Sequence, residues 1–598
     1  MSAPHERPAL DSAAAAPRAV PPPALYDHAE RLRAAGPLPP PGGHPLPATA
    51  RPLDAPRRPG LRHREARAAV TGVLLDHLTA SGAAPTAVAA AERALLATGV
   101  RERSALSLAA ALAPPDPDKA RVLARALVRT GTTVVGVAAG LGLLTRLAEP
   151  EDVPYLRALG LLDGLGHAAA SVLDPLDRPA AALTWLIHRV RGEELRAFAE
   201  AVAADDRPAV LDRLTRLPTG ARDCGPETAR RVAEAAGLAG TLRSRPDRPA
   251  LLTQALRLLT RMTSRREYRA EILRYGEAVE VYGTLAAHAH RLPRDLDHRA
   301  RLLTLALDLH SGASHLLAWP PGHREALLAA FLDAAEAVGD VPVEPGERRR
   351  ADWADRTARH LRAVRPGGPE PAPRLRIEVA VADPAEPDVA ETRFLIDGRP
   401  LVAEFFGRGP GDAPERLLDS GALRATAAPR KVRLAEAYCT EGCCGALYVT
   451  VRREGGHVVW SDWRRPGRGP AGPQDPPAYR FDAGAYDAEV ARAENDHDWT
   501  WPARRTARLI AAGLRDRPGL LTRWGLEPGW TGTDFSAPDT TLVTFTGPPL
   551  TAPPAAPAGP ESRQFLWRLP DDGTPPEERA ARALRGLAGT DPRTLADS

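Results

Sequence analysis

The sequence predicts a multi-domain fold class: an all-α helical-repeat (α-solenoid-like) region followed by a small α+β domain with an antiparallel meander sheet. The chain has 598 residues, more than the roughly 250–300 at which a single hydrophobic core stops growing. Apolar residues recur at helical spacing in the first part and alternate with period two in the second. The expected organisation is a disordered arm at 1–58, helices at 59–365, a linker at 366–373, the α+β domain at 374–550 and a tail at 551–598.

The N-terminal arm is dominated by Pro, Ala and Gly and contains few large apolar side chains. A segment of this composition cannot bury enough apolar surface to offset its loss of conformational entropy, so we expect disorder. Within the arm, residues 24–33 are the exception, because their sequence is compatible with a short docking helix.

The helical region begins near residue 61 and consists of short amphipathic segments separated by Pro and Gly. Over 119–129, Val122, Leu123 and Leu127 mark one apolar face, and Gly131-Thr-Thr133 ends that helix and caps the next. Helices of about 10–15 residues with connections this short pack antiparallel on their neighbours. That packing is typical of an α-solenoid.

One inter-helix turn carries a resemblance to a known repeat family. The segment Leu147-Ala-Glu-Pro-Glu-Asp-Val-Pro-Tyr-Leu156 resembles the turn of HEAT-type repeats, in which a Pro-containing or acidic turn precedes a second helix. The resemblance implies a solenoid of helix pairs, an architecture that presents an extended protein-binding surface.

After the linker the pattern is typical of β-strands. Strands are expected at 375–381, 394–396, 401–405, 431–438, 447–452 and 458–463, in one meandering sheet of about five strands. Asp397-Gly398 is a strong hairpin signal between the second and third of these segments. Helices at 486–493 and 503–515 are expected to cover one face, and 541–545 adds a last strand. The tail has a Pro-rich linker and then a docking helix that starts at Pro575.

Composition limits the class of protein. The chain has 79 Lys+Arg against 75 Asp+Glu and only 4 cysteines, too few for a disulfide framework in a chain of this length. It has neither a signal-peptide h-region nor a run of about 18 apolar residues. The short basic runs lack interleaved aromatic residues. We therefore expect a cytoplasmic protein with a protein partner, and neither nucleic acid nor a membrane as a partner.

The cysteine turn, Cys439-Thr-Glu-Gly-Cys-Cys-Gly445, contains three of the four cysteines. Cys439, Cys443 and Cys444 are candidate metal ligands, and zinc is the cofactor that three thiolates and one imidazole would hold. A vicinal or Cys439-containing disulfide is a second reading, and simple packing of small apolar side chains is a third. All three readings stay open at this point.

A zinc site would need a fourth ligand. His457 starts the returning strand of the hairpin, and a strand rises about 3.3 Å per residue, so it belongs at the opposite end from the cysteine turn. The fourth ligand is therefore expected to be His497, or else a residue supplied by a second copy of the chain in a dimer. His497 lies in a second polar cluster, Glu494-Asn-Asp-His-Asp-Trp-Thr-Trp501, in which Asp496 and Asp498 could act as an acid/base group beside a pocket. Solvated charges at a helix end explain the same cluster without a site.

The sequence shows no catalytic or cofactor-binding motif. Gly-x-Ser-x-Gly, Walker A and His-Glu-x-x-His patterns are absent from the sequence, and Gly407-Arg-Gly-Pro-Gly411 lacks the glycine order of a phosphate-binding loop. Cys224, far from the other cysteines, is expected to pack in the core. The sequence thus favours a non-enzymatic protein.

A second resemblance covers part of the α+β domain. The segment from Asp397-Gly-Arg-Pro-Leu401 through the cysteine turn to Trp460-Ser-Asp-Trp463 is similar to uncharacterised actinobacterial proteins with a cysteine-rich turn before a hairpin, and no activity follows from it. The leading hypothesis is a cytosolic protein-interaction or scaffold protein whose helical repeats form the binding surface. The alternatives are metal-binding or thiol-redox activity of the α+β domain, and an immunity or stress-response protein.

Overall fold

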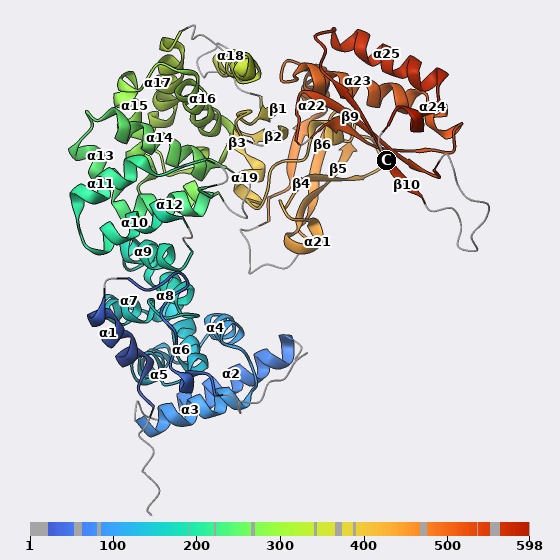
Figure 1. The fold of residues 1–598 in the computed structure, drawn as a ribbon. Coiled ribbons are helices and arrows are strands. Elements are labelled where there is room, and N and C mark those ends of the chain that lie inside the picture. Colours follow the sequence, from blue (N-terminus) through green and yellow to red (C-terminus); the bar gives the residue numbers. More distant parts are fainter. Residues whose placement is uncertain are drawn as a thin grey trace, which may run out of the picture. The chain divides into compact units, whose positions relative to one another are not determined.

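A computed structural model (Figure 1) describes residues 22–36, 38–52, 63–79, 85–189, 192–220, 223–264, 270–339, 344–364, 373–386, 390–466, 475–534, 536–549 and 562–596. The chain divides into two compact units. The N-terminal unit contains residues 1–217 and 234–236, and the C-terminal unit contains 218–233 and 237–598. Most of the predicted linker, 366–372, lies outside the described residues.

The N-terminal unit is built from helices. They are α1 (Leu25–Ala35), α2 (His63–Thr79), α3 (Pro85–Ala97), α4 (Glu102–Ala110), α5 (Pro117–Thr130), α6 (Val134–Leu147), α7 (Val153–Leu159), α8 (Gly166–Leu173), α9 (Arg178–Arg189), α10 (Glu193–Ala203) and α11 (Arg207–Arg216). Helices close in sequence pack together, as α5 does on α6 and α8 on α9. α12 (Pro226–Ala236) has residues in both units.

The predicted cap at Gly131-Thr-Thr133 is confirmed, and the structure adds a second cap at Asp116. Asp116 accepts a hydrogen bond from the backbone of Lys119 at the start of α5, and the Thr133 side chain accepts one from Gly136 at the start of α6. The turn between them is closed by buried Glu92, which accepts hydrogen bonds from the backbone of Thr133 at 2.8 Å and of the residue before it.

Part of the predicted disordered arm is folded. α1 corresponds to the expected docking helix, because Leu25 and Ala29 are buried and the Leu25 amide donates to the carbonyl of Gly131. Residues 38–52 are also placed against this unit, where the Gly42 carbonyl lies 2.8 Å from His188 Nδ1. These contacts supply the burial that composition alone did not indicate. Residues 1–21 and 53–62 lie outside the described residues.

The C-terminal unit combines helices with sheets. Its other helices are α13 (Leu238–Ser244), α14 (Pro249–Thr263), α15 (Ala278–His288), α16 (Leu296–Ser311), α17 (His323–Ala337), α18 (Arg348–Ala363), α19 (Leu401–Phe405), α20 (Pro414–Leu417), α21 (Glu441–Cys444), α22 (Ala483–Asn495), α23 (Pro502–Asp516), α24 (Gly519–Thr522) and α25 (Pro576–Gly589). Figure 1 shows α16 and α18 beside the first strands.

The strands of this unit form three antiparallel sheets within the described residues. The first has the order β1 (Leu375–Val381), β2 (Ala390–Ile396), β3 (Arg399–Pro400); the second β4 (Arg430–Glu436), β5 (Ala446–Glu454), β6 (His457–Arg464), β7 (Tyr479–Asp482); the third β10 (Arg563–Pro570), β9 (Thr540–Gly547), β8 (Glu527–Thr533). An α-helical region followed by an α+β region is the predicted fold class, and it is confirmed.

Two details of the predicted sheet are wrong. Residues 375–396 and 430–464 do not join one sheet; they form two sheets that share a hydrophobic core around Trp460, whose ring centroid lies 5.5 Å from that of Phe394. The segment 401–405 is helix α19, because the hairpin partner of β2 ends at Pro400, which lacks an amide hydrogen for a continuing ladder.

The end of the described chain completes the third sheet. β10 pairs with β9 along its whole length, and α25 packs on α23. A core of Ile510, Phe545, Phe565, Leu584 and their neighbours holds these elements together. Within the described part of the chain, none of the helices has the length and apolar character needed to cross a membrane.

Candidate functional site

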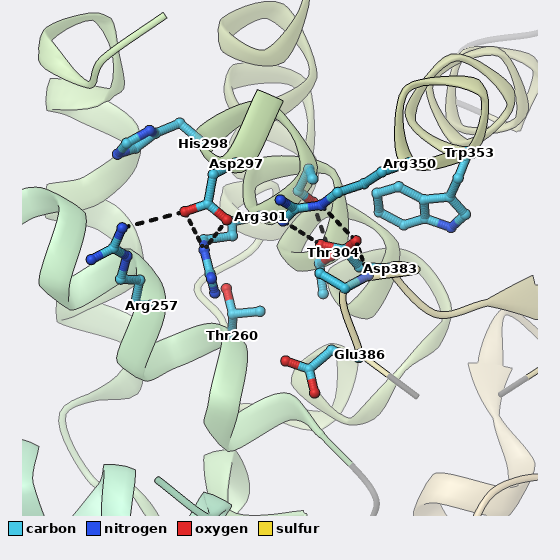
Figure 2. A network of polar contacts seen from close by, with 12 residues as sticks. Arg257, Thr260, Asp297, His298, Arg301, Thr304, Arg350, Trp353, Asp383 and Glu386 are labelled. Atoms are coloured by element: carbon cyan, nitrogen blue, oxygen red, sulfur yellow. Dashed lines mark hydrogen bonds and ion pairs between the residues drawn. The ribbon is translucent and has the colours of Figure 1, made fainter. Parts of the chain in front are cut away.

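A network of charged residues fixes α18 within the C-terminal unit (Figure 2). Arg350, near the start of α18, donates to both carboxylate oxygens of Asp383 at 2.8 and 2.7 Å and to Asp297 of α16 at 2.9 Å. Asp297 also accepts two hydrogen bonds from Arg301 at 3.0 Å, and Arg257 of α14 lies 3.5 Å away. These interactions tie three helices to the residues that follow β1.

The electrostatics of the network follow from burial and pairing. Although burial opposes ionisation, the guanidinium groups of Arg301 and Arg350 hold the pKa of Asp297 far below its usual range. The carboxylates of Asp383 and Asp297 outweigh the effect of burial and raise the pKa of Arg350. Next to this pair, Trp353 is 1% exposed and its Nε1 donates to the Val381 carbonyl at 2.9 Å. α18 is therefore anchored directly to the end of β1.

A cavity of about 620 Å³ opens beside this anchored helix. We call it the basic cavity. Its lining residues come from α16, α18, β1, α22 and the segment after α22: Leu307, Trp353, Arg356, Thr357, Arg359, His360, Ala363, Val364, Arg376, Val379, Ala380, Val381, Arg492, Asn495, Asp496, His497, Asp498 and Trp499. Its volume lies in the range of small-molecule sites.

Arginines dominate the charge of the basic cavity. Arg356 is half-buried, and neither it nor Arg359 forms a hydrogen bond or ion pair with another described residue. Burial lowers the pKa of Arg356; the charge of Asp352, one turn earlier on α18, opposes this shift, and the like charges of Arg359 and Arg349 add to it. By contrast, Arg492 on the facing side is paired with Glu489 at 2.8 Å.

The polar cluster singled out at 494–501 forms part of this lining. Asp496, His497, Asp498 and Trp499 face the cavity, whereas the Nε1 of Trp501 donates to the Pro538 carbonyl. Burial, together with the charge of Arg508, lowers the pKa of His497, and Arg508 NH1 lies 3.2 Å from its Nδ1. Burial and the neighbouring guanidinium therefore both disfavour the protonated form of His497.

A cluster of two histidines and a glutamate lies at the edge of the basic cavity, and we call it the His–Glu cluster. It brings together His310 of α16, His360 of α18 and Glu378 of β1, whose ligand atoms lie within 4.8 Å of one another. Sequence reasoning missed it. The three residues are separated by 50 and 18 positions and have no local motif, so only the packing of the two helices on β1 reveals the cluster.

The cysteine turn folds as the short helix α21 between β4 and β5. The Sγ atoms of Cys439, Cys443 and Cys444 lie within 4.8 Å of one another, and Cys443 and Cys444 are 3.7 Å apart. Hydrogen bonding with Cys439, aided by burial, raises the pKa of Cys444 to about 12. Burial acts to raise the pKa of Cys439, but its hydrogen bonds with Cys444 and Thr440 lower it.

The predicted histidine partner is not part of this thiol group. The group contains the three cysteines, whereas His497 lines the basic cavity and bonds to Arg508. His457 lies at the far end of the hairpin, as expected, and contacts Arg480 at 3.0 Å. Cys224 is 2% exposed, in line with its predicted packing role. Metal binding by Cys439, Cys443, Cys444 and His497 remains a prediction.

Two other cavities are less suited to a ligand of defined charge. One, of about 120 Å³, lies between α14, α16 and the end of β1; its acidic residues Asp383 and Glu386 are paired with Arg350 and Arg261. The other, of about 650 Å³, is lined by Cys439 and the exposed Trp530.

The fold and the cavity define a class of protein: a helical region followed by an α+β domain, with a basic pocket formed where helices pack on a sheet. No protein-family model, curated protein or solved structure matches the chain. The functional argument therefore rests on the chain's own chemistry.

Proposed function

We propose that the C-terminal unit binds a small anionic ligand, one that carries a phosphate or carboxylate group, in the basic cavity. The observation that carries the proposal is Arg356, a half-buried guanidinium that lines the cavity and forms neither a hydrogen bond nor a close ion pair with a described residue. A charge removed from water without a partner costs free energy, and an anion in the cavity would offset that cost. The planar guanidinium suits bidentate contacts with phosphate or carboxylate oxygens.

The surroundings of Arg356 support a charged ligand of limited size. Arg359 lies one helical turn further along α18, and Arg376 of β1 lines the same cavity. Leu307 and Val379 add apolar surface beside these charges. A site with a few convergent polar groups on an otherwise apolar wall is typical of small-molecule pockets.

The proposal is tested by titrating the full-length protein with inorganic phosphate and with citrate, followed by calorimetry. We expect saturable binding that weakens as salt is added, because exposed charges are screened. The variant Arg356→Met should lose at least about tenfold in affinity, since hydrogen bonds to charged groups contribute about 1.5–3 kcal/mol. Arg515→Met, an exposed arginine of α23 that does not line the cavity, is the matched control. Equal affinities for the two variants would exclude the proposed site.

A second candidate function is metal binding by the cysteine turn. The close approach of the three Sγ atoms favours it, because thiolates within 4.8 Å can share one soft ion. Metal analysis of the purified chain, compared with Cys439→Ser, tests it. A protein partner for the helical region stays a prediction from the sequence, and affinity capture with the full-length chain tests that.

A further inference from the structure

The His–Glu cluster combines three side chains from separate elements around one point. His310 Nε2 lies 2.9 Å from Glu378 Oε2, and His360 Nε2 lies 3.6 Å from the same oxygen. The two imidazole rings meet edge to face, with centroids 6.1 Å apart. Each histidine therefore presents a ring nitrogen to the carboxylate.

These spacings fit a shared metal ion, although the shorter one is also that of a hydrogen bond between His310 and Glu378. With zinc bonds of about 2.0–2.2 Å to nitrogen and oxygen, tetrahedral ligand atoms are about 3.3–3.5 Å apart. The two measured distances, 2.9 and 3.6 Å, bracket that spacing, so movements of a few tenths of an ångström would admit an ion. Two histidines and one carboxylate form the protein ligand set of open zinc sites and of facial-triad iron sites.

The second carboxylate oxygen of Glu378 has an ion pair with Arg376 but no hydrogen bond. The Glu378 side chain is 3% exposed, yet its Oε1 accepts no hydrogen bond from the described residues, and Arg376 Nε is 3.5 Å away. A buried carboxylate oxygen without a hydrogen bond is costly.

An ion in the cluster would be accessible from the basic cavity. His360 lines that cavity, and its side chain is 32% exposed, whereas His310 on the other side is 13% exposed. Three protein ligands leave at least one coordination position for water or for an anion. We propose that His310, His360 and Glu378 form a divalent-metal site, with zinc as the ion that the ligand set favours. The inference stands independently of anion binding by Arg356.

The test separates this site from the cysteine turn. The full-length protein is stripped with chelator and titrated with Co²⁺ and Zn²⁺ in a background with Cys439, Cys443 and Cys444 all changed to Ser. We expect one ion per chain, with visible cobalt d–d bands and no thiolate charge-transfer band. His360→Asn and Glu378→Gln should each weaken binding by more than about 100-fold, beyond the 10–100-fold that loss of an outer hydrogen-bond partner costs.

His290→Asn, an exposed histidine outside the cluster, is the matched control and should bind as tightly as its parent. His360 is the more exposed ligand, so its variant is the one expected to keep the native circular dichroism spectrum if Glu378→Gln misfolds. Two outcomes would overturn the proposal: no ion in the background that lacks Cys439, Cys443 and Cys444, or unchanged affinity in a folded His360→Asn chain. The first result would leave the cluster as a plain buried ion pair.

Discussion

Replacing Arg356 of α18 should stabilise the ligand-free protein, whereas replacing Arg350 of the same helix should destabilise it. Arg356→Met removes a half-buried charge that forms neither a hydrogen bond nor a close ion pair with a described residue, while the methionine keeps the apolar part of the side chain. Arg350→Met makes the same chemical change less than two turns earlier, but there the charge is bonded to Asp383 and Asp297. The two variants therefore make the same substitution, and they differ in whether the lost guanidinium was bonded to carboxylates.

The magnitudes follow from the contacts. Loss of Arg350 leaves the carboxylate of Asp383, 5% exposed, without its charged partner, which costs about 3–5 kcal/mol. The C-terminal unit spans about 380 residues, and an unfolding entropy of about 2.1 cal/mol/K per residue converts each kcal/mol into a Tm shift of about 1.3 °C. Arg350→Met should lower Tm by about 4–6 °C. Arg356→Met removes the burial penalty of the guanidinium but also its attraction to Asp352, so the net gain should be small, about 0.5–1 kcal/mol, or a rise of about 1 °C.

Without ligand, Arg356→Met should have the higher Tm; with phosphate bound, the wild-type protein should have the higher Tm. A ligand at a concentration of about 100 times its Kd raises the free energy of unfolding by about 2.7 kcal/mol. For a unit of this size, that is a rise in Tm of about 3–4 °C. Thermal unfolding followed by tryptophan fluorescence, with and without phosphate, measures both effects, because Trp353 and Trp499 line the cavity. The reasoning fails if Arg356→Met loses as much stability as Arg350→Met, since Arg356 would then have a structural partner.

Three further predictions concern other parts of the C-terminal unit. In peptide mapping after iodoacetamide treatment, Cys439 should react faster than Cys444, and Cys439→Ser should accelerate Cys444 by removing the hydrogen bond that raises its pKa to about 12; equal rates would contradict the pairing. Burial and the charge of Arg324 lower the folded-state pKa of His315 to about 4. Between that value and the ordinary pKa of about 6.5, the unfolded chain binds a proton that the folded chain does not. The free energy of unfolding should therefore fall by about 1–2 kcal/mol as the pH drops from 7 to 4. In urea titrations His315→Gln should remove that slope, and a variant with an unchanged slope would show that another group titrates. Gly411→Ala places a Cβ against the carbonyl of Thr392 and should cost about 1–3 kcal/mol, whereas Gly442→Ala meets no atom within 4 Å and should be neutral or slightly stabilising; chemical denaturation of the two variants compares them.

Features that depend on neighbouring residues could be predicted from the sequence. The cap at Thr133 marks the start of α6 because its side chain bonds to the backbone amide three residues on. The hairpin at Asp397-Gly398 forms because both residues take positive φ, 49° and 79°, as a type I′ turn requires. Such signals are complete within a few residues of sequence.

Features that depend on packing between distant elements could not be predicted. The split between the first two sheets is decided by side chains such as Phe394 and Trp460, which meet only in the folded core. His310 and His360 lie on amphipathic helices, where a histidine has no sequence signal beyond that of any polar residue. The cysteine turn was found because three thiols are adjacent in sequence, but its fourth ligand was assigned to His497 by elimination, and His497 lies in a different cavity.

Because α18 is anchored at Trp353, the number of residues after Trp353 decides which side chains of the helix reach the basic cavity. Arg356 and His360 follow Trp353 by three and seven residues, spacings that keep all three side chains on one face of an α-helix. One residue inserted between Trp353 and Arg356 would turn both downstream groups by about 100° and advance them by about 1.5 Å. The tryptophan would stay in place while the guanidinium and the imidazole left the cavity together. In related chains, binding chemistry at this site should therefore tolerate substitutions along α18 far better than a change in its length.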